Sequence, residues 1–186
     1  DEEAELFASR LSQPAKVVGL FNGINTRRFD PFTVQPDPVM QAMPGPRLIF
    51  TGQMDYQPNI DAVVRAATRL MPRIRAVMPE ATLHIVGRGP TAQVRALDGT
   101  SGCKVWGRVD DIATYLRAAD LALIPLDIAR GVQNKVLEAM AMALPVVTTP
   151  GAATGIGAEN GREILVGEDD DALVRCALSL LHDQHR

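Results

Sequence analysis

The sequence has few aromatic residues, few cysteines and no excess of positive charge. Aromatic residues make up 4% of the chain, so the core must consist of aliphatic side chains and methionine. Cys103 and Cys176 belong to no Cys-x-x-Cys pair, and we expect two buried apolar thiols in a reducing cytoplasm. The formal net charge of −3 argues against a nucleic-acid-binding surface, because such surfaces are usually strongly basic.

Long apolar runs and a secretory signal are also missing. The longest apolar run, residues 139–147, contains Pro145 and is too short to cross a bilayer. Residues 1–3 are acidic, whereas a secretory signal would begin with basic and then apolar residues. Since the chain does not begin with Met, we expect it to be an excerpt of a longer protein.

The sequence does contain a regular alternation of short apolar runs and amphipathic stretches. Near-continuous apolar runs are typical of strands that helices cover on both faces. The predicted strands are residues 16–20, 47–50, 81–86, 104–106, 121–124 and 145–147. Residues 22–45, which contain four prolines, are predicted to be a long loop or linker.

Four stripes of apolar residues at helical spacing lie between or after these strands. They cover residues 60–71, 112–119, 136–144 and 173–181. We expect Asn59 and Asp110 to cap the first two helices and Pro145 to stop the third. Three acidic residues, 169–171, precede the fourth, where the helix dipole favours negative charge. Alternating strands and helices predict an α/β domain with a doubly wound, Rossmann-like parallel sheet and helices on both faces.

Glycine or polar residues follow four of the predicted strands. Ligands of doubly wound sheets bind beyond the carboxyl ends of the strands, so these positions indicate a binding edge. The glycines concerned are Gly52, Gly87, Gly107 and Gly131. Each of them also fits a tight strand-to-helix turn.

The segment from Gly87 to Ala92 formally matches the G-x-G-x-x-A dinucleotide fingerprint. However, Pro90 stands where the turn should open into a helix, and no acidic residue ends the next predicted strand, 104–106. A Rossmann oxidoreductase domain therefore stays as an alternative interpretation only.

Residues 130–140 carry the strongest functional signal. A glycine-containing loop runs there into a helix whose first turn holds Asn134 and Lys135. Free N–H groups at a helix start, together with an ammonium group, suit a diphosphate. Glu138 follows one turn later and could accept two hydrogen bonds from a cis-diol such as a ribose. The alternative is a surface carboxylate paired with Lys135 or Arg130.

Several segments resemble the C-terminal domain of group 1 glycosyltransferases with the GT-B fold. They are "LHIVGRGP", "KVWGRVDDIATYLRAADLALIPL" and "GVQNKVLEAMAMALPVVTT". "FNGINTRRFDP" resembles the segment that links the two domains of that family, and "GQMDYQPNIDA" resembles the opening of the C-terminal domain. The resemblance implies two parts: residues 1–24 are the tail of a missing N-terminal domain and the linker, and residues 25–186 are the donor-binding domain.

The resemblance further implies an enzyme that moves a sugar from a nucleoside diphosphate sugar to an acceptor hydroxyl. By analogy with the family, transfer retains the anomeric configuration and needs no metal or other cofactor. The enzyme would serve polysaccharide or glycoconjugate synthesis. The catalytic groups would lie in the protein's own N-terminal domain, and the fragment alone should be inactive. The location would be cytoplasmic, with the inner membrane face as a contact of the longer protein, and nucleic acid is not an expected partner.

The family pattern also implies roles for individual residues. Glu138 would hold the ribose hydroxyls, and the loop at Arg108 and Val109 would carry the base through main-chain contacts. Gly52 and Gly87 would lie at the same edge of the sheet, at the carboxyl ends of the strands. The diphosphate and the sugar would contact Gly131, Val132, Gln133, Asn134 and Lys135.

Two departures from the family pattern bear on the function. Arg130 stands where the family has the first of two glutamates. Gln53 and Met54 replace the basic residues that usually follow Gly52. The positive charge for a diphosphate must then come from Arg130, Lys135 and helix ends, with Arg88 or Arg108 as further candidates. A salt bridge from Arg130 to Asp127 or Glu138 is the alternative, and a non-catalytic sugar-nucleotide-binding module is the alternative for the whole domain. His84 lies inside a predicted strand and is expected to be a satisfied core residue.

Overall fold

The computed structural model describes residues 7–11, 17 and 22–183. Its six strands are β1 (Arg47–Thr51), β2 (Thr82–Val86), β3 (Cys103–Gly107), β4 (Leu121–Ile124), β5 (Val146–Thr148) and β6 (Leu165–Val166). They form one sheet in the order β3-β2-β1-β4-β5-β6, and every neighbouring pair is parallel. The order reverses between β1 and β4, which is the place where doubly wound sheets bind their ligands.

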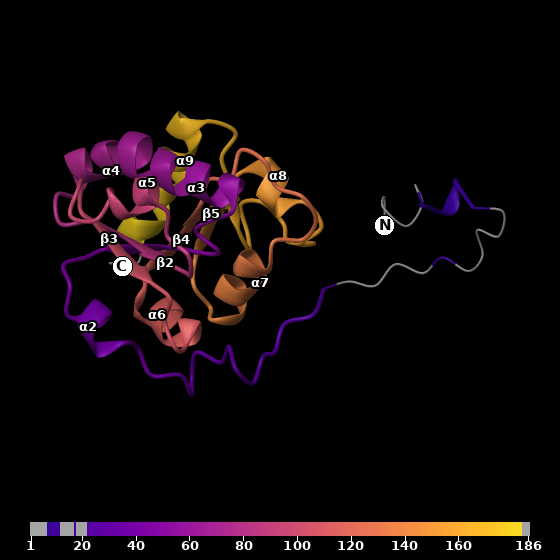
Figure 1. Cartoon of the computed structure of the whole chain (residues 1–186), viewed down its shortest axis with the longest axis horizontal. Helices are drawn as coiled ribbons and strands as arrows, with labels where there is room; N and C mark the ends of the chain where they lie inside the picture. The colour runs from indigo at the N-terminus through magenta and orange to yellow at the C-terminus, as the bar shows by residue number, and fades with distance from the viewer. Residues whose placement is uncertain (1–6, 12–16, 18–21, 184–186) are drawn as a thin grey trace.

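Helices cover both faces of this sheet. Their bounds are α2 (Pro38–Gln41), α3 (Gln57–Arg65), η2 (Ala66–Leu70), α4 (Met71–Val77), α5 (Ala92–Arg95), α6 (Ile112–Ala118), α7 (Asn134–Ala141), α8 (Pro150–Ala153) and α9 (Asp170–Asp183). Figure 1 shows α3, α4 and α9 on one face and α6 and α7 on the other. Strands β1, β2, β4 and β5 are almost wholly buried, because helices shield both of their faces. The predicted doubly wound α/β domain is confirmed.

Five of the six predicted strands are confirmed. The sixth, residues 16–20, lies outside the described residues except for residue 17. Strand β6 was not predicted, because its two residues are too few to give a recognisable pattern. Among the described residues, no helix combines the length and the apolar character that a membrane span requires.

The first predicted helix begins earlier than Asn59, so the prediction that Asn59 caps it is wrong. The cap is Tyr56, and Pro58 sits in the first turn, where its fixed φ suits a helix and its missing N–H costs nothing. Farther along, Pro72 cannot donate a helical hydrogen bond. The helix passes through one π-helical segment, η2, just before it.

Of the three other predicted helix boundaries, two differ from the structure and one is confirmed. The cap of α6 is Asp111, whose carboxylate accepts the N–H of Ala113, and not Asp110. Helix α7 ends at Ala141, before Pro145, because Ala143 takes a left-handed conformation (φ 52°). The N–H of Leu144 then bonds back to the carbonyl of Ala139 at 3.0 Å. The predicted acidic start of α9 is confirmed, since the Asp169 carboxylate accepts the N–H of Ala172.

The predicted loop at residues 22–45 is anchored by apolar side chains and contains one short helix. Phe29 and Met40 are buried in the core of the domain. Helix α2 arises because Asp37 accepts the N–H of Met40 at 2.8 Å and Pro38 begins the turn. This segment is thus held against the domain even though most of it has no regular structure.

His84 on β2 is a fully buried core residue, as predicted. Trp106 on β3 donates its indole N–H to Nδ1 of His84 at 3.0 Å. Since an indole can only donate, Nε2 of His84 carries the proton and donates to Thr82 Oγ1 at 2.9 Å. Thr82 in turn donates to the carbonyl of Pro44 at 2.8 Å. Burial first, and then the charge of Arg47, lower the His84 pKa to about 4, so the imidazole is neutral.

Candidate functional site

A cleft of about 420 Å³ opens at the carboxyl ends of β1 and β4, where the strand order reverses. Its walls come from the end of β1, the start of α3, the start of α6 and the loop that leads into α7. The lining residues are Thr51, Gly52, Gln53, Tyr56, Asn59, Ile112, Arg130, Gln133, Asn134, Lys135 and Glu138. The structure therefore brings together six of the predicted site residues from two segments that lie far apart in the sequence.

Close backbone packing shapes the rim of the cleft. The N–H of Gly52 donates to the carbonyl of Val86 at 3.1 Å, and the N–H of Gly87 donates to Gly107 at 2.8 Å. A Cβ atom on Gly87 would stand only 1.6 Å from the carbonyl oxygen of Gly52. Gly87 must therefore be glycine for the ends of β1 and β2 to approach each other. It packs against Gly52, which lines the cleft, but is not itself a lining residue.

Lys135 is the positive group at the bottom of the cleft. Its Nζ donates to Oδ1 of Asn59 at 2.5 Å and lies 4.2 Å from the centre of the Phe50 ring. Asn59 also donates from its amide nitrogen to the carbonyl of Gln53 at 2.9 Å, so it joins the loop after β1 to the ammonium group. Burial lowers the Lys135 pKa to about 7, and the negative charge of Glu138 partly opposes this shift. Of three ammonium N–H bonds, only one has a partner among the described residues.

Glu138 stands one helical turn after Lys135 and also faces the cleft. Burial raises the pKa of its carboxyl group, and the charges of Arg28 and then Lys135 oppose that shift. Within the described part of the chain, the carboxylate of Glu138 has no hydrogen bond or ion pair. The alternative interpretation, a surface carboxylate in a salt bridge with Lys135 or Arg130, is therefore not what the structure shows.

The loop before α7 carries Arg130 to the cleft wall. Asp127 pairs with the buried Arg65 at 2.5 Å instead of with Arg130. No ion pair joins Arg130 to any residue that the structure describes, so both salt-bridge alternatives are absent there. The amide of Gln133 donates back to the carbonyls of Arg130 and Gly131, which closes the loop on itself. Among the described residues no side chain caps the start of α7. The N–H of Val136 bonds to the carbonyl of Gln133, and the N–H groups of Asn134 and Lys135 remain available to a ligand.

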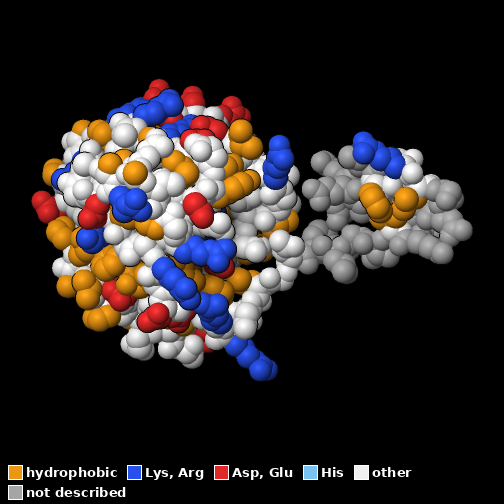
Figure 2. Space-filling view, viewed as in Figure 1, with side chains coloured by type: hydrophobic (Ala, Val, Ile, Leu, Met, Phe, Trp, Pro, Cys, Tyr) orange, Lys and Arg blue, Asp and Glu red, His pale blue; other side chains and the backbone are white. Residues whose placement is uncertain are grey.

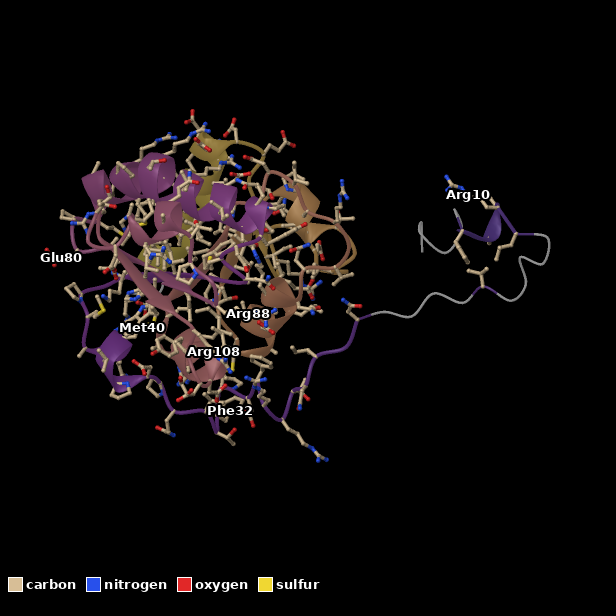
Figure 3. The ribbon with its side chains drawn as sticks, viewed as in Figure 1. Arg10, Phe32, Met40, Glu80, Arg88 and Arg108 are labelled. Atoms are coloured by element: carbon tan, nitrogen blue, oxygen red, sulfur yellow. The ribbon has the colours of Figure 1, made fainter. Side chains whose placement is uncertain are left out.

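The remaining predicted site residues lie around the cleft and not in its lining. Val109 packs partly against the core, and a Cβ atom on Gly155 would stand 3.0 Å from Cγ2 of Val132. Gly131 takes a positive φ of 62° that allows the turn of the loop. Arg88 bonds to Gln53 at 2.8 Å. Arg88 and Arg108 lie on one face of the domain (Figure 3), where basic side chains gather in Figure 2.

Five lining residues were not predicted as site residues: Thr51, Gln53, Tyr56, Asn59 and Ile112. Thr51 and Tyr56 flank the loop after β1, and Ile112 opens α6. Asn59 was taken for a helix cap, and no local pattern distinguishes a capping asparagine from one that reaches a lysine far along the chain. Pro58 was the one available signal, because a proline marks the first turn and places the next residue inside the helix.

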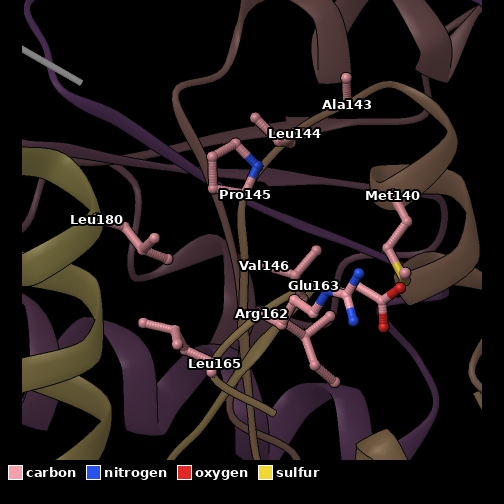
Figure 4. A pocket seen from close by; sticks show the side chains of 11 residues that line it. Met140, Ala143, Leu144, Pro145, Val146, Arg162, Glu163, Leu165 and Leu180 are labelled. Atoms are coloured by element: carbon pink, nitrogen blue, oxygen red, sulfur yellow. The ribbon is translucent and has the colours of Figure 1, made fainter. Parts of the chain in front are cut away.

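A second cavity, of about 410 Å³, lies at the opposite end of the sheet. It begins at the amino end of β5 and is bounded by Leu180 of α9 and by the segment around Leu165. Figure 4 shows its largely apolar side chains, among them Leu144 and Pro145, with Arg162 and Glu163 close by. Of these two cavities in the described part of the chain, the first combines cationic groups, an uncapped helix start and a half-buried carboxylate, and the second does not.

Comparison with known protein families shows to which of them the chain belongs. The family described as "Glycosyl transferases group 1" matches residues 45–183, which include the whole sheet and every residue that lines the cleft. The chain belongs to this family. The resemblance seen in the sequence is thereby confirmed. A search among curated proteins finds no match.

Solved structures of glycosyltransferases share the fold. HepE of Anabaena in complex with UDP superposes with a TM-score of 0.71 at 14% identity, over 97% of this chain and 52% of that one. Sucrose-phosphate synthase of Thermosynechococcus elongatus gives 0.66 at 18% identity, over 100% and 48% of the two chains. WaaG, a glycosyltransferase involved in lipopolysaccharide biosynthesis, gives 0.55 at 23% identity, over 75% and 39%. This chain thus spans about half the length of HepE, and its fold is one half of the GT-B architecture.

Proposed function

We propose that this domain binds the nucleoside diphosphate sugar of a glycosyltransferase that transfers the sugar to an acceptor hydroxyl. The observation that carries the proposal is that Lys135 and Glu138, one helical turn apart on α7, both line the cleft. The ammonium group and the uncapped start of α7 suit the diphosphate. The carboxylate, which no described residue hydrogen-bonds, suits the two hydroxyls of a ribose.

The family supports this assignment. The structure of HepE, which has the same fold and contains UDP, supports it as well. The finer features are part of the proposal: retention of configuration, independence from metal ions, a role in polysaccharide or glycoconjugate synthesis, and a cytoplasmic location. The acceptor and the catalytic groups are proposed to belong to the protein's own N-terminal domain. We therefore expect the chain alone to bind nucleotide without transferring sugar.

A specific observation keeps a non-catalytic sugar-nucleotide-binding module as the second candidate. Arg130 replaces a glutamate that the family pattern expects beside the sugar. Such a module would bind donor in the same cleft but would show no transfer even within the longer protein. The dinucleotide alternative is weaker, because Gly87 is already required for packing against Gly52.

Nucleotide titration tests the proposal. UDP, GDP and NAD are titrated into the chain by calorimetry and by thermal shift, where a ligand at 100 times its Kd adds about 2.7 kcal/mol to stability. Binding of UDP or GDP, but not NAD, is the expected result. Binding of NAD alone, or of none of the three, would contradict it.

Substitution Glu138→Gln tests the residue on which the proposal depends most. Loss of a charge-assisted hydrogen bond should weaken nucleoside diphosphate binding by about 1.5–3 kcal/mol. The midpoint of thermal unfolding should change little, because no described residue bonds to this carboxylate. Unchanged affinity in calorimetry would show that Glu138 is only a structural residue.

A further inference from the structure

Asn59 makes two hydrogen bonds that use the two ends of its amide group. Its Oδ1 accepts a hydrogen bond from Nζ of Lys135 at 2.5 Å, and its amide nitrogen donates to the carbonyl of Gln53 at 2.9 Å. Since an ammonium group can only donate and a carbonyl can only accept, the two partners fix which end of the amide is the oxygen. Asn59 is buried, so water competes little for either bond. An aspartate could replace the first bond but not the second.

The surroundings of this contact restrict the position of the ammonium group. The buried Phe50 ring has its centre 4.2 Å from Nζ of Lys135. A Cβ atom on Gly52 would stand 2.8 Å from the amide nitrogen of Asn59 and 3.2 Å from Nζ of Lys135, so the glycine leaves room for the pair. Lys135 belongs to α7, but its charged end is thus held by α3 at the end of β1.

The side of the cleft that holds the ammonium group does not neutralise it. The lining residues from β1, from α3 and from the loop between them are all uncharged: Thr51, Gly52, Gln53, Tyr56 and Asn59. The other charged lining residues, Arg130 and Glu138, come from the loop before α7 and from α7 itself. No ion pair joins Lys135 to any residue of the described ranges. The positive charge therefore stays available to an anionic ligand.

We propose that Asn59 is a positioning residue of the donor site: its neutral oxygen fixes the Lys135 ammonium group at the end of β1 and leaves the charge of that group to the phosphates of the ligand. This inference rests on the proposed function and deepens it, because it assigns part of the preference for a charged nucleotide to a single amide of α3. A carboxylate at the same position would still accept the bond from Lys135, but it would oppose the charge that the phosphates need.

The substitution Asn59→Asp, which hardly changes the shape of the side chain, tests the inference by calorimetry of UDP and GDP binding from pH 6.5 to 9. At pH 6.5 binding should weaken about tenfold, the lower end of the range for a hydrogen bond to a charged group. The new carboxylate should also raise the Lys135 pKa from about 7, so that the lysine stays charged at pH 9. The affinity of the variant should then be constant, whereas that of the unmodified chain falls, and their difference should shrink as the pH rises.

Asn134→Asp is the matched control. Asn134 also lines the cleft, but its side chain bonds to Asn22 and not to Lys135. This variant adds the same charge to the cleft, so it should lower the affinity but keep the fall with rising pH. Asn59→Ala is a second variant of the proposed residue. It removes the acceptor without adding a charge, and it should weaken binding less than Asn59→Asp at pH 6.5 and keep the fall with pH.

NMR titration of the lysine side chains provides a readout that needs no ligand. The sequence contains three lysines, Lys16, Lys104 and Lys135, and Lys135→Arg identifies the signal of the last. That signal should titrate near pH 7 in the unmodified chain. Its midpoint should lie at a clearly higher pH in Asn59→Asp than in Asn134→Asp, because only the first variant places a carboxylate against the ammonium group.

A loss of affinity in Asn59→Asp that is equal at every pH would overturn the inference, since a general defect of the cleft has no reason to depend on the charge of Lys135. So would an unchanged titration of Lys135 in that variant, or unchanged affinity at pH 6.5. If the unmodified chain binds neither UDP nor GDP, the proposed function itself fails; binding with parallel pH profiles in the two proteins rejects this inference alone. Unfolding midpoints show whether each variant is folded.

Discussion

Two regions of this domain bury titratable groups, and they differ in how fully those groups are bonded. In the region of β2 and β3, both ring nitrogens of His84 have partners, and the chain of hydrogen bonds ends on a backbone carbonyl. At the ends of β1 and β4, the Lys135 ammonium group has one hydrogen-bond acceptor among the described residues, and the Glu138 carboxylate accepts no hydrogen bond from them. The first region is complete without a ligand, and the second is not.

The difference matters because burial of a polar group costs free energy unless hydrogen bonds compensate. His84 meets this condition by itself, so its bonds join β2, β3 and the loop before β1 into one unit. Lys135 and Glu138 keep bonding capacity that a diphosphate and a diol could use. We infer that the His84 region serves stability and that the Lys135 region serves binding, and three experiments separate the two.

The largest effect is expected from His84→Ala. It removes a buried ring and leaves the Trp106 indole N–H and the Thr82 hydroxyl without their partner. Cavity formation and unpaired groups should together lower the free energy of unfolding by about 3–5 kcal/mol, as measured by urea denaturation. Nucleotide affinity, measured under conditions where the variant remains folded, should stay unchanged. A large loss of affinity in the folded variant would contradict the inference that the His84 region serves stability and not binding.

The second effect concerns the pH dependence of binding through Lys135. Its pKa is about 7 in the free protein, chiefly because of burial, and a bound diphosphate would raise it. Binding then takes up a proton, so affinity should fall as pH rises above about 7, by at most about tenfold per pH unit. Calorimetry of UDP and GDP binding from pH 6.5 to 9 measures this fall.

Lys135→Arg is the control for that titration, because an arginine stays charged over the whole pH range. Its affinity should not vary between pH 7 and 9, whatever its absolute value. If the unmodified chain binds equally well at pH 7 and pH 9, Lys135 does not contact the phosphates. The same series leaves His84 neutral throughout, since its pKa is about 4.

The smallest effect is expected from Arg130→Ala. Arg130 is exposed and has no ion pair within the described residues, so its contribution should be about 0.2–1 kcal/mol. The loss should be greater for UDP or GDP than for the plain nucleosides, and it should shrink as salt screens the charge. Equal losses for diphosphate and nucleoside would mean that Arg130 acts through the conformation of its loop.

Local patterns in the sequence predicted most of the fold. The apolar runs located β1 to β5, and the helical stripes located α3, α6, α7 and α9, because buried faces impose their spacing on neighbouring residues. The errors occurred where a few residues decide the outcome. Asp111 caps α6 in place of Asp110, and Ala143 ends α7 ahead of Pro145. Such boundaries depend on single backbone conformations that spacing does not reveal.

The candidate site, too, could be predicted from the sequence only in part. The helix periodicity of residues 134–141 was sufficient to place Lys135 and Glu138 about one turn apart, since a separation of three positions is close to the roughly 3.6 residues of a full turn. Only the tertiary structure decided that Asn59 reaches Lys135 across 76 positions and that Arg28 of the linker pairs with Asp111 at the start of α6. Backbone spacing is a local property that the sequence expresses directly. Contacts between distant segments depend on the order of the strands, which brings the ends of β1 and β4 together, and on the buried Phe29, which holds the linker against the domain.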